Sequence, residues 1–308
     1  MSSPSRRSIR ASSDGFSLIE VLVSLVIAMV VTSAAMSMAL SSREVFEQDQ
    51  RRSIVNQNLR SGLGLLGIDV RQAGERMPGD APAVEIQNGS SGAADTLILR
   101  RNLLDYVLPL CKDINAGSSA DSVFVGKKKI TGSVPPGCSP VPDSNGDGWP
   151  DNLEAWREYR IANGGAVLAY LHNPVTGNGE FFLYDAEDNS TFHIHRQNPG
   201  AWLYDHLMSQ NPRIYIIEQK RYRVLGDTLQ CIINENTAGA LNLVNHIKDF
   251  QVKALLDDGS VLTSMASTTP WTRLYALEVR LDGTKPFGKR TINRTMVSRF
   301  FPRNILSN

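Results

Sequence analysis

A stretch in the middle of the chain, DSNGDGWPDNLE at residues 143–154, could bind a metal ion. Oxygen-bearing side chains occur at its positions 1, 3, 5, 9 and 12, which is the ligand spacing of a calcium-binding loop. Trp149 at position 7 would bind through its backbone carbonyl, and Gly148 at position 6 permits the sharp turn. The alternative is a solvated loop, because Asn-Gly and Asp-Gly pairs also favour turns. We expect a structural Ca²⁺, held with a dissociation constant of roughly 10⁻⁴ to 10⁻³ M, by the side chains of Asp143, Asn145, Asp147, Asp151 and Glu154.

Cysteine and histidine residues form the other candidate sites. The chain has three cysteines, so at least one is unpaired if disulfides form within it. We expect a disulfide between Cys111 and Cys138, but spacing alone leaves the connectivity open. Cys231 lies in the strand-like stretch LQCII and is expected to be buried. His193 and His195 have no cysteine or carboxylate at ligand spacing, so we interpret them as surface or cross-strand residues rather than zinc ligands.

The charge and the motifs exclude several classes of function. The chain has 32 Lys and Arg against 31 Asp and Glu, so there is no overall basic field for nucleic acid. The run from Lys127 to Lys129 is interpreted as a solvated turn, because three charges give little affinity for DNA at physiological salt. The sequence contains neither a G-x-S-x-G elbow nor a P-loop, and we predict no enzyme.

An acidic residue, Glu20, stands at the edge of an apolar run that is long enough to cross a bilayer. Residues 21–42 carry no charge, and a carboxylate in hydrocarbon is costly unless a partner neutralises it. Arginines precede the run, which predicts a cytoplasmic N-terminus and places the residues after Ser42 across the membrane. A cleaved signal peptide would have a shorter apolar run. A plain signal anchor would leave Glu20 unexplained.

The helix that carries Glu20 is predicted to continue far beyond the membrane. Apolar residues recur at spacings of four, four, three and four, the period of an amphipathic helix, at Val55, Leu59, Leu63, Leu66 and Val70. We predict one helix from about residue 17 to 73, ending at Gly74, which is first a membrane stem and then the spine of a domain. The stretch GLGLLG at residues 62–67 resembles a dinucleotide fingerprint. No strand precedes it, so we interpret it as a small-residue face where the spine packs closely or bends.

After Gly74 the hydrophobic period changes from 3.6 to 2, which indicates strands. An α+β fold follows, in which a long helix packs on a mainly antiparallel sheet. The stretch from about residue 106 to 160 breaks the rhythm and is interpreted as an insertion that carries the calcium-type loop. The predicted strands are DTLILRR, AVLAYLH, EFFLYD, TFHIHR, RIYIIEQKRYRVL, LQCII, DFQVKALL, RLYALEVRL and RTINRTMVSRFF.

The basic leader, Gly15, Phe16, the letters SLIE and the apolar helix together resemble the class III leader of type IV prepilins and pseudopilins. In that family an inner-membrane peptidase cuts after the glycine and methylates the new N-terminal phenylalanine. The resemblance implies a leader at residues 1–15, a helix at 16–74 that spans the membrane at 16–42, and a globular domain at 75–308. It also implies that Glu20 pairs with the N-terminal amine of a neighbouring subunit, so that two costly charges neutralise each other.

Four internal motifs in their order resemble the PilW family of type IV minor pilins: GIDVRQAG, ADTLILRR, the pair DFQVKALLDDG and LYALEVRL, and RTMVSRFFPRN. PilW-like chains often carry a cysteine shortly after this AG, whereas the sequence here is AGERMPGD. The resemblance implies a structural minor pilin at or near the pilus tip that primes assembly with other minor pilins and the major pilin. Its further partners would be the prepilin peptidase, the assembly platform and inner-membrane lipid before assembly, and the resemblance allows a tip adhesin.

Two other functions stay open on the sequence. A type II secretion pseudopilin of the J kind shares the leader and a similar domain, and gene neighbourhood distinguishes it from a pilus protein. A signal-anchored surface binding protein would use the calcium-type loop. An N-methylated Phe16 would support a prepilin, whereas an intact Met1 would support the anchored protein.

Overall fold

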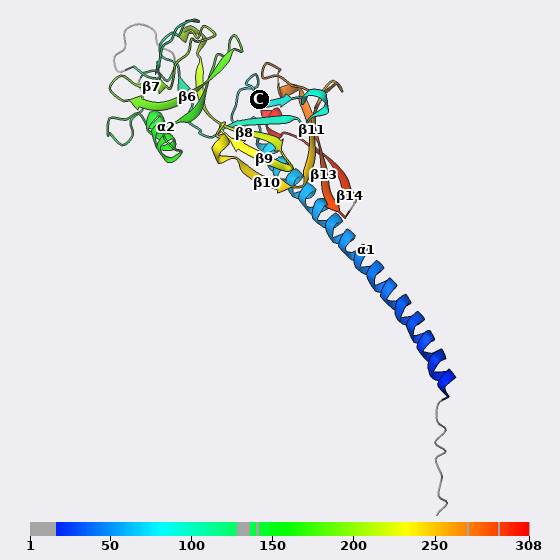
Figure 1. Ribbon diagram of the computed structural model, residues 1–308. Helices are drawn as coiled ribbons and strands as arrows, with labels where there is room; N and C mark the ends of the chain where they lie inside the picture. The colour runs from blue at the N-terminus through cyan, green and yellow to red at the C-terminus, as the bar shows by residue number, and fades with distance from the viewer. Residues whose placement is uncertain (1–16, 128–135, 140–141, 270, 289, 308) are drawn as a thin grey trace, which may run out of the picture. The chain divides into compact units, whose positions relative to one another are not determined.

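The computed structural model describes residues 17–127, 136–139, 142–269, 271–288 and 290–307. Within these residues the chain forms a long N-terminal helix, a shorter second helix and antiparallel sheets, which confirms the predicted α+β fold (Figure 1). The chain divides between Ser53 and Ile54 into two compact units.

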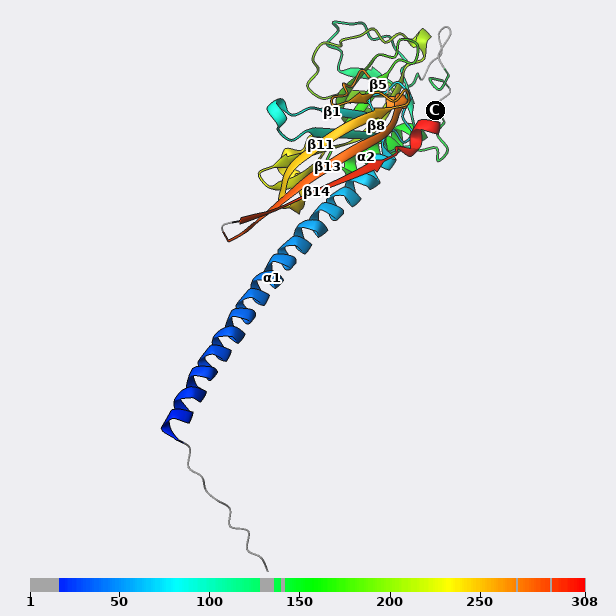
Figure 2. The ribbon, with the colours of Figure 1, turned by 90° about the vertical axis from the view of Figure 1, so that its right-hand side faces the viewer.

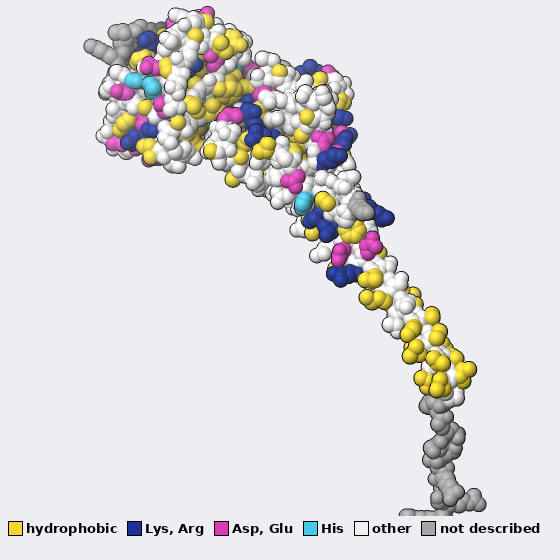
Figure 3. All heavy atoms as spheres, viewed as in Figure 1, with side chains coloured by type: hydrophobic (Ala, Val, Ile, Leu, Met, Phe, Trp, Pro, Cys, Tyr) yellow, Lys and Arg dark blue, Asp and Glu magenta, His cyan; other side chains and the backbone are white. Residues whose placement is uncertain are grey.

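Helix α1 (Leu18–Gln72) occupies nearly the predicted range of residues 17–73. In the first unit its large apolar side chains from Leu18 to Phe46 are exposed, and Figure 3 shows them crowded along this part of the helix. The helix is long and apolar enough to cross a membrane. Exposed apolar side chains over such a length are costly in water, because burial of apolar surface is the main force that favours folding. The first unit therefore requires an apolar environment, either lipid or other helices.

The second part of α1 forms the spine of the folded domain. All five apolar residues of the predicted stripe are buried, and Val55, Leu59 and Val70 are fully buried. They belong to a hydrophobic core that includes β11 (Ile247–Leu256) and β13 (Leu274–Phe287). Figure 2 shows these strands lying along the C-terminal part of α1. The residues around this core are called the spine lobe.

The glycines of GLGLLG allow the close packing that the sequence predicts. A Cβ at Gly67 would lie 2.5 Å from Cε1 of Phe300, and one at Gly62 would lie 3.1 Å from Cδ1 of Leu281. Gly64, between them, has no such neighbour within 4 Å. Two of these glycines therefore bring the spine backbone close to strands from the C-terminal part of the chain.

The spine lobe contains a four-stranded antiparallel sheet in the order β12-β11-β13-β14. Strand β13 pairs with β14 (Arg290–Phe300) from Leu277 opposite Phe300 to Phe287 opposite Arg290, and β12 (Val261–Leu262) closes the other edge. The predicted strands DFQVKALL, RLYALEVRL and RTINRTMVSRFF are confirmed here.

The remaining described strands form a second sheet whose main path is β1-β2-β8-β5-β6-β7-β4. Strand β8 (Arg213–Leu225) belongs to two parts of the domain, because its first residues pair with β5 and β3 and its later residues pair with β2 and β9. The other members are β1 (Val84–Gln87), β2 (Thr96–Asn102), β3 (Leu108–Pro109), β4 (Ser122–Phe124), β5 (Val167–His172), β6 (Gly179–Asp188), β7 (His193–Arg196), β9 (Thr228–Ile233) and β10 (Leu241–Asn245). Short 3₁₀ helices lie at Ser90–Gly92, Met208–Gln210, Thr237–Gly239, Trp271–Arg273 and Arg303–Ser307.

A second hydrophobic core lies around β5, β6 and helix α2 (Asp151–Ala162), and the residues around it are called the second lobe. Leu153 and Trp156 anchor α2 in this core, and the Trp156 indole N–H donates to the Tyr106 carbonyl at 2.8 Å. The core extends from Leu108 to Ile216. The second lobe is thus larger than the insertion expected at residues 106–160, because strands β5 to β7 and the first part of β8 also pack into it.

Candidate functional site

Glu20 lies in the first turn of α1, where its backbone N–H donates to the Ser17 carbonyl at 3.0 Å and to the Ser17 hydroxyl at 3.3 Å. This contact resembles one half of a capping box, in which a serine three residues before a glutamate satisfies a free backbone N–H. Within the described residues no side chain pairs with the Glu20 carboxylate, and the residue is exposed. Gly15 and Phe16, the expected processing residues, lie outside the described residues.

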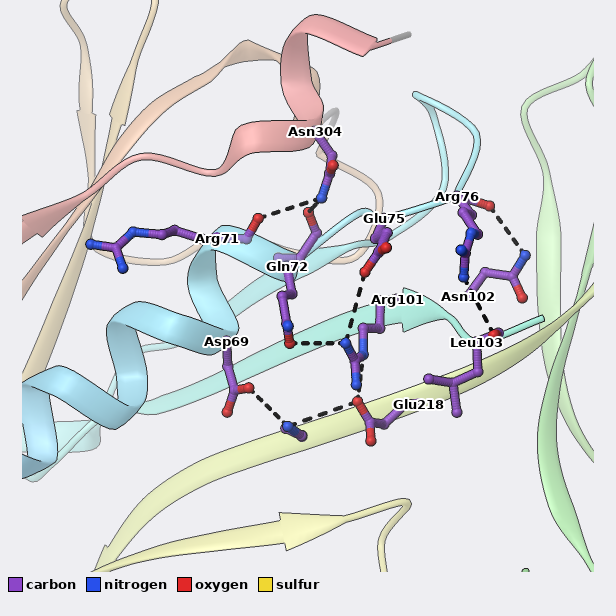
Figure 4. Close-up of polar contacts among 12 residues, drawn as sticks. Asp69, Arg71, Gln72, Glu75, Arg76, Arg101, Asn102, Leu103, Glu218 and Asn304 are labelled. Atoms are coloured by element: carbon purple, nitrogen blue, oxygen red, sulfur yellow. Dashed lines mark hydrogen bonds and ion pairs between the residues drawn. The ribbon is translucent and has the colours of Figure 1, made fainter. Parts of the chain in front are cut away.

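At the C-terminal end of α1, a network of polar and charged side chains links the spine to the second sheet (Figure 4). Arg101 of β2 lies 2.6 Å from Glu218 of β8 and donates to the Gln72 side chain at 2.9 Å. Lys220 of β8 lies 2.8 Å from Asp69 of the spine. These side chains are mostly buried, so losing one partner would leave the other charged in a poorly solvated place. The network fixes where the helix ends relative to the sheet.

The last turn of the spine is capped from the C-terminal part of the chain. Asn304 donates from Nδ2 to the Ala73 carbonyl at 3.1 Å. Gly74 has φ +75°, a left-handed conformation that suits a helix C-terminus, and a Cβ there would lie 2.1 Å from Cη2 of Trp271. Orphan carbonyls at a helix end need such donors.

Residues from three of the four internal motifs noted in the sequence meet around the last turns of the spine. GIDVRQAG supplies Asp69 and Gln72, ADTLILRR supplies Arg101, and RTMVSRFFPRN supplies Phe300 and Asn304. Along the chain, Trp271 follows β11 and precedes β13, the two strands of the third motif. Sequence reasoning noted the motifs but did not identify this network, because the signal is their order rather than any ligand spacing.

The calcium-type loop has some of the expected geometry. Asp143 accepts from the Gly146 N–H at 2.8 Å and from the Gly148 N–H at 3.0 Å, and both glycines have positive φ. The Asn145 amide lies between two carboxylates, 3.2 Å from Asp147 Oδ2 and 3.3 Å from Glu154 Oε2. These contacts bring three of the predicted ligands, Asn145, Asp147 and Glu154, to one side of the loop.

Other parts of the loop do not have a ligand arrangement. Asp151 accepts from the Ser144 hydroxyl at 2.6 Å and from the Ser144 N–H at 2.8 Å. The Trp149 N–H donates to Asp147 at 2.8 Å. Partial burial and the nearby negative charges of Asp147 and Glu158 raise the pKa of Glu154. Nowhere in the described residues do three or more His, Cys, Asp or Glu side chains form a group that could hold a metal ion.

The cysteines have the expected states. A disulfide joins Cys111 and Cys138, whose Cα atoms are 5.7 Å apart, and both residues are fully buried in the second lobe. Cys231 is free and buried. Its burial raises the pKa of the thiol. The structure therefore contains a covalent link across the stretch that precedes the calcium-type loop.

The histidines of β7 have separate partners. His195 Nδ1 lies 2.6 Å from Asp185, whereas His193 Nδ1 contacts the Thr191 hydroxyl at 2.7 Å. His193 faces its cross-strand neighbour Phe124 at a ring distance of 5.5 Å. Lys128 and Lys129 lie outside the described residues.

Comparison with known proteins identifies the N-terminal segment. Residues 10–36 match the family model described as the prokaryotic N-terminal methylation motif. No curated protein matches the chain. No solved structure matches it either. The motif and the apolar helix indicate a type IV pilin-type or pseudopilin-type structural protein, anchored in a membrane as a prepilin, processed by the prepilin peptidase and assembled with other pilins.

Proposed function

We propose that the chain is a PilW-like minor pilin that is incorporated at or near the tip of a type IV pilus and primes its assembly. The observation that carries this proposal is the N-terminal methylation motif at residues 10–36, which leads directly into helix α1. The helix first exposes apolar side chains and then buries them in the domain. This order suits a subunit that leaves the membrane to join a helix bundle, with its N-terminus in the cytoplasm before assembly.

Glu20 would take part in assembly by pairing with the amine that cleavage creates at Phe16. An unpaired carboxylate among apolar helices is costly, and the amine of a neighbouring subunit would neutralise it. The fixed first turn of α1, where Ser17 caps the Glu20 N–H, supports this role by holding the carboxylate at the start of the helix.

The size of the domain supports a place at or near the tip. Residues 54–308 carry a second lobe in addition to the spine lobe. Inside a filament each subunit is surrounded by copies packed through their helices, and an extra lobe would need room that the neighbours occupy. The last subunit has no neighbour beyond it, so a bulky domain is tolerated best there.

Replacing Glu20 with Ala tests the assembly role. We expect normal processing, seen as an N-methylated Phe16 by mass spectrometry, with a drop of roughly tenfold or more in the amount found in sheared pili. Glu44→Ala is the matched control, because Glu44 is an exposed glutamate of the same helix beyond the apolar run. Normal pilus incorporation of Glu20→Ala would rule out the pairing. An intact Met1 in the parent protein would rule out a prepilin. If Glu20→Ala reduces protein secretion and not the formation of pili, the chain is a pseudopilin.

We also propose that the loop at residues 143–154 binds a structural Ca²⁺. Asn145, Asp147 and Glu154 already lie close together, and Asp143, Asp151 and the Trp149 carbonyl would complete the oxygen set. Partial burial, and then repulsion from Asp147, raises the pKa of Glu154, and calcium would offset that repulsion. Binding would join the start of α2 to the loop.

A calcium titration of thermal unfolding tests the site in the full chain in detergent micelles. With a dissociation constant of roughly 10⁻⁴ M, about 1 mM calcium should stabilise the fold by about 1.4 kcal/mol and raise the melting temperature. The double variant Asp147→Ala, Glu154→Ala should lose this shift, whereas Glu158→Ala, one turn further along α2, should keep it. A parent protein whose melting temperature does not respond to calcium would eliminate the site.

A further inference from the structure

A cleft of about 590 Å³ is lined by residues that belong neither to α1 nor to the calcium-type loop. One wall comes from the β5–β6 hairpin and the loop after β7, and the other comes from residues 80–82 and 267–268. Figure 3 shows the surface hollowed between the two lobes. The volume is within the range of small-molecule sites, roughly 300 to 1,000 Å³.

The wall of this cleft contains a tyrosine hydroxyl that has no hydrogen-bond partner within the described residues. Tyr170 is only 3% exposed, and its ring packs against Phe181 at a centroid distance of 4.6 Å. No hydrogen bond to its hydroxyl occurs within the described residues. Gly179 makes room for this hydroxyl, since a Cβ there would lie 2.2 Å from the oxygen. The ring is buried but the hydroxyl oxygen is not among the fully buried polar atoms, so it is accessible from the cleft and can bind a ligand. Burial also raises the pKa of Tyr170, which keeps the hydroxyl protonated.

The other polar groups of the cleft favour an uncharged ligand. Asp80 is half exposed and supplies a carboxylate, while Arg196 supplies a guanidinium that stacks on the Trp202 ring at 4.1 Å. Glu180 also lines the cleft, but its buried carboxylate accepts from two backbone N–H groups. The opposite charges of Asp80 and Arg196 therefore leave no field of one sign to attract an ion. The Asn178 amide and the Ser267 hydroxyl add groups that can both donate and accept.

An exposed aromatic ring, carried by a well-held backbone, stands beside these polar groups. Tyr204 is 38% exposed, and no ring contact to it occurs within the described residues. Its backbone is held by Glu180, which is buried and accepts from the Tyr204 N–H at 2.9 Å and from the Leu203 N–H at 2.9 Å. Rigid tyrosine rings supply contact area at low entropic cost. The loop therefore presents a preformed platform next to hydrogen-bonding groups.

We propose that this cleft binds a neutral saccharide. A sugar ring has an apolar C–H face, which would stack on Tyr204, and a rim of hydroxyls, which both donate and accept. The Tyr170 hydroxyl would donate to one of them, and Asp80 would accept from others. This site is independent of pilus assembly, so its failure would leave the Glu20 experiment unaffected.

Saturation-transfer NMR tests the site on the full chain in micelles of a detergent without a sugar headgroup, such as lauryldimethylamine oxide. The probes are four neutral disaccharides: cellobiose, maltose, lactose and diacetylchitobiose. We expect at least one to bind. Tyr170→Phe should weaken its binding roughly tenfold, because one hydrogen bond is lost, and Tyr204→Ala should weaken it at least as much.

The variants have matched controls. Tyr275→Phe and Tyr275→Ala make the same changes on the exposed face of β13, where Tyr275 is 61% exposed, and should leave binding unchanged. Tyr170→Phe removes a hydroxyl that has no partner, so its melting temperature should not fall. If none of the four disaccharides binds, or if Tyr170→Phe and Tyr204→Ala bind like the parent, the proposal is wrong.

Discussion

At the scale of single residues, two buried histidines couple the second lobe to pH. His172 Nε2 lies 3.0 Å from Asp80, and His206 Nε2 lies 3.4 Å from Glu180. Neither ring makes a hydrogen bond within the described residues. Burial lowers the pKa of both histidines. Nearby carboxylates oppose this effect, Asp80 at His172 and Glu180 and Asp205 at His206. The folded state therefore favours the neutral rings.

The stability of the fold should decrease as the pH falls from about 7 to 5. A histidine whose pKa is lowered on folding binds more protons in the unfolded chain, so its contribution is complete above about pH 6.5 and is lost below it. The slope is at most about 1.4 kcal/mol per pH unit for each histidine. Urea unfolding at several pH values measures this slope. His206→Gln should reduce the slope of stability against pH. His246→Gln is the control, because the His246 side chain is 30% exposed, and it should leave the slope unchanged. Equal slopes in the parent and both variants would contradict the role given to His206.

The residue scale also separates what the sequence could predict from what it could not. The burial of Cys231 was predicted from its strand pattern, and the expected pairing of Cys111 with Cys138 is confirmed, although spacing alone left the connectivity open. The Tyr170 cleft was not, because its groups come from strands and loops far apart in the chain. The spacing predicts that Asp151 is a calcium ligand, and it did not reveal the contact in which Asp151 accepts from the Ser144 N–H, since short polar side chains readily satisfy nearby backbone groups.

At the scale of elements, the glycines of the spine provide a direct test of close packing. Gly67→Ala should destabilise the domain by about 1–3 kcal/mol, because the added methyl group would overlap the Phe300 ring. Gly64→Ala makes the same change where nothing lies within 4 Å, and it should stabilise the helix by about 0.5–1 kcal/mol. Chemical denaturation measures both. Equal effects of the two substitutions would show that backbone entropy, rather than contact with β14, determines the result.

Hydrophobic period predicted the elements best where they are long. The spine stripe and the long strands β8, β11, β13 and β14 were found because each repeats its pattern over many residues. Strands β3 and β12 have two residues each, too few to show a period. Pairing partners were also inaccessible, since β8 lies between β2 and β5 only through contacts that are distant in sequence.

At the scale of the whole molecule, the described part of the domain has two hydrophobic cores, and strands β5 and β8 each contribute residues to both. Ile216 of β8 belongs to the second core, whereas Tyr222 of the same strand belongs to the spine core. The letters RIYIIEQKRYRVL read as one continuous strand, so the sequence gives no sign of this division. The predicted insertion at residues 106–160 was a partial view of the second lobe, which also needs later strands to bury its apolar residues.

Removing the disulfide should loosen the second lobe before the spine lobe. The link between Cys111 and Cys138 closes a loop across 27 positions, and the loop-entropy relation gives it about 3.5 kcal/mol. In the double variant Cys111→Ser, Cys138→Ser, hydrogen exchange should become faster at the Ile216 amide, while the amides of β11 and β13 stay protected. Cys231→Ala, which changes a buried cysteine outside the disulfide, should not produce this pattern. Equal loss of protection at Ile216 and in β13 would show that the two cores unfold as a single unit. Selective loss at Ile216 would show that the second lobe of this pilin-type protein can unfold independently of the spine lobe.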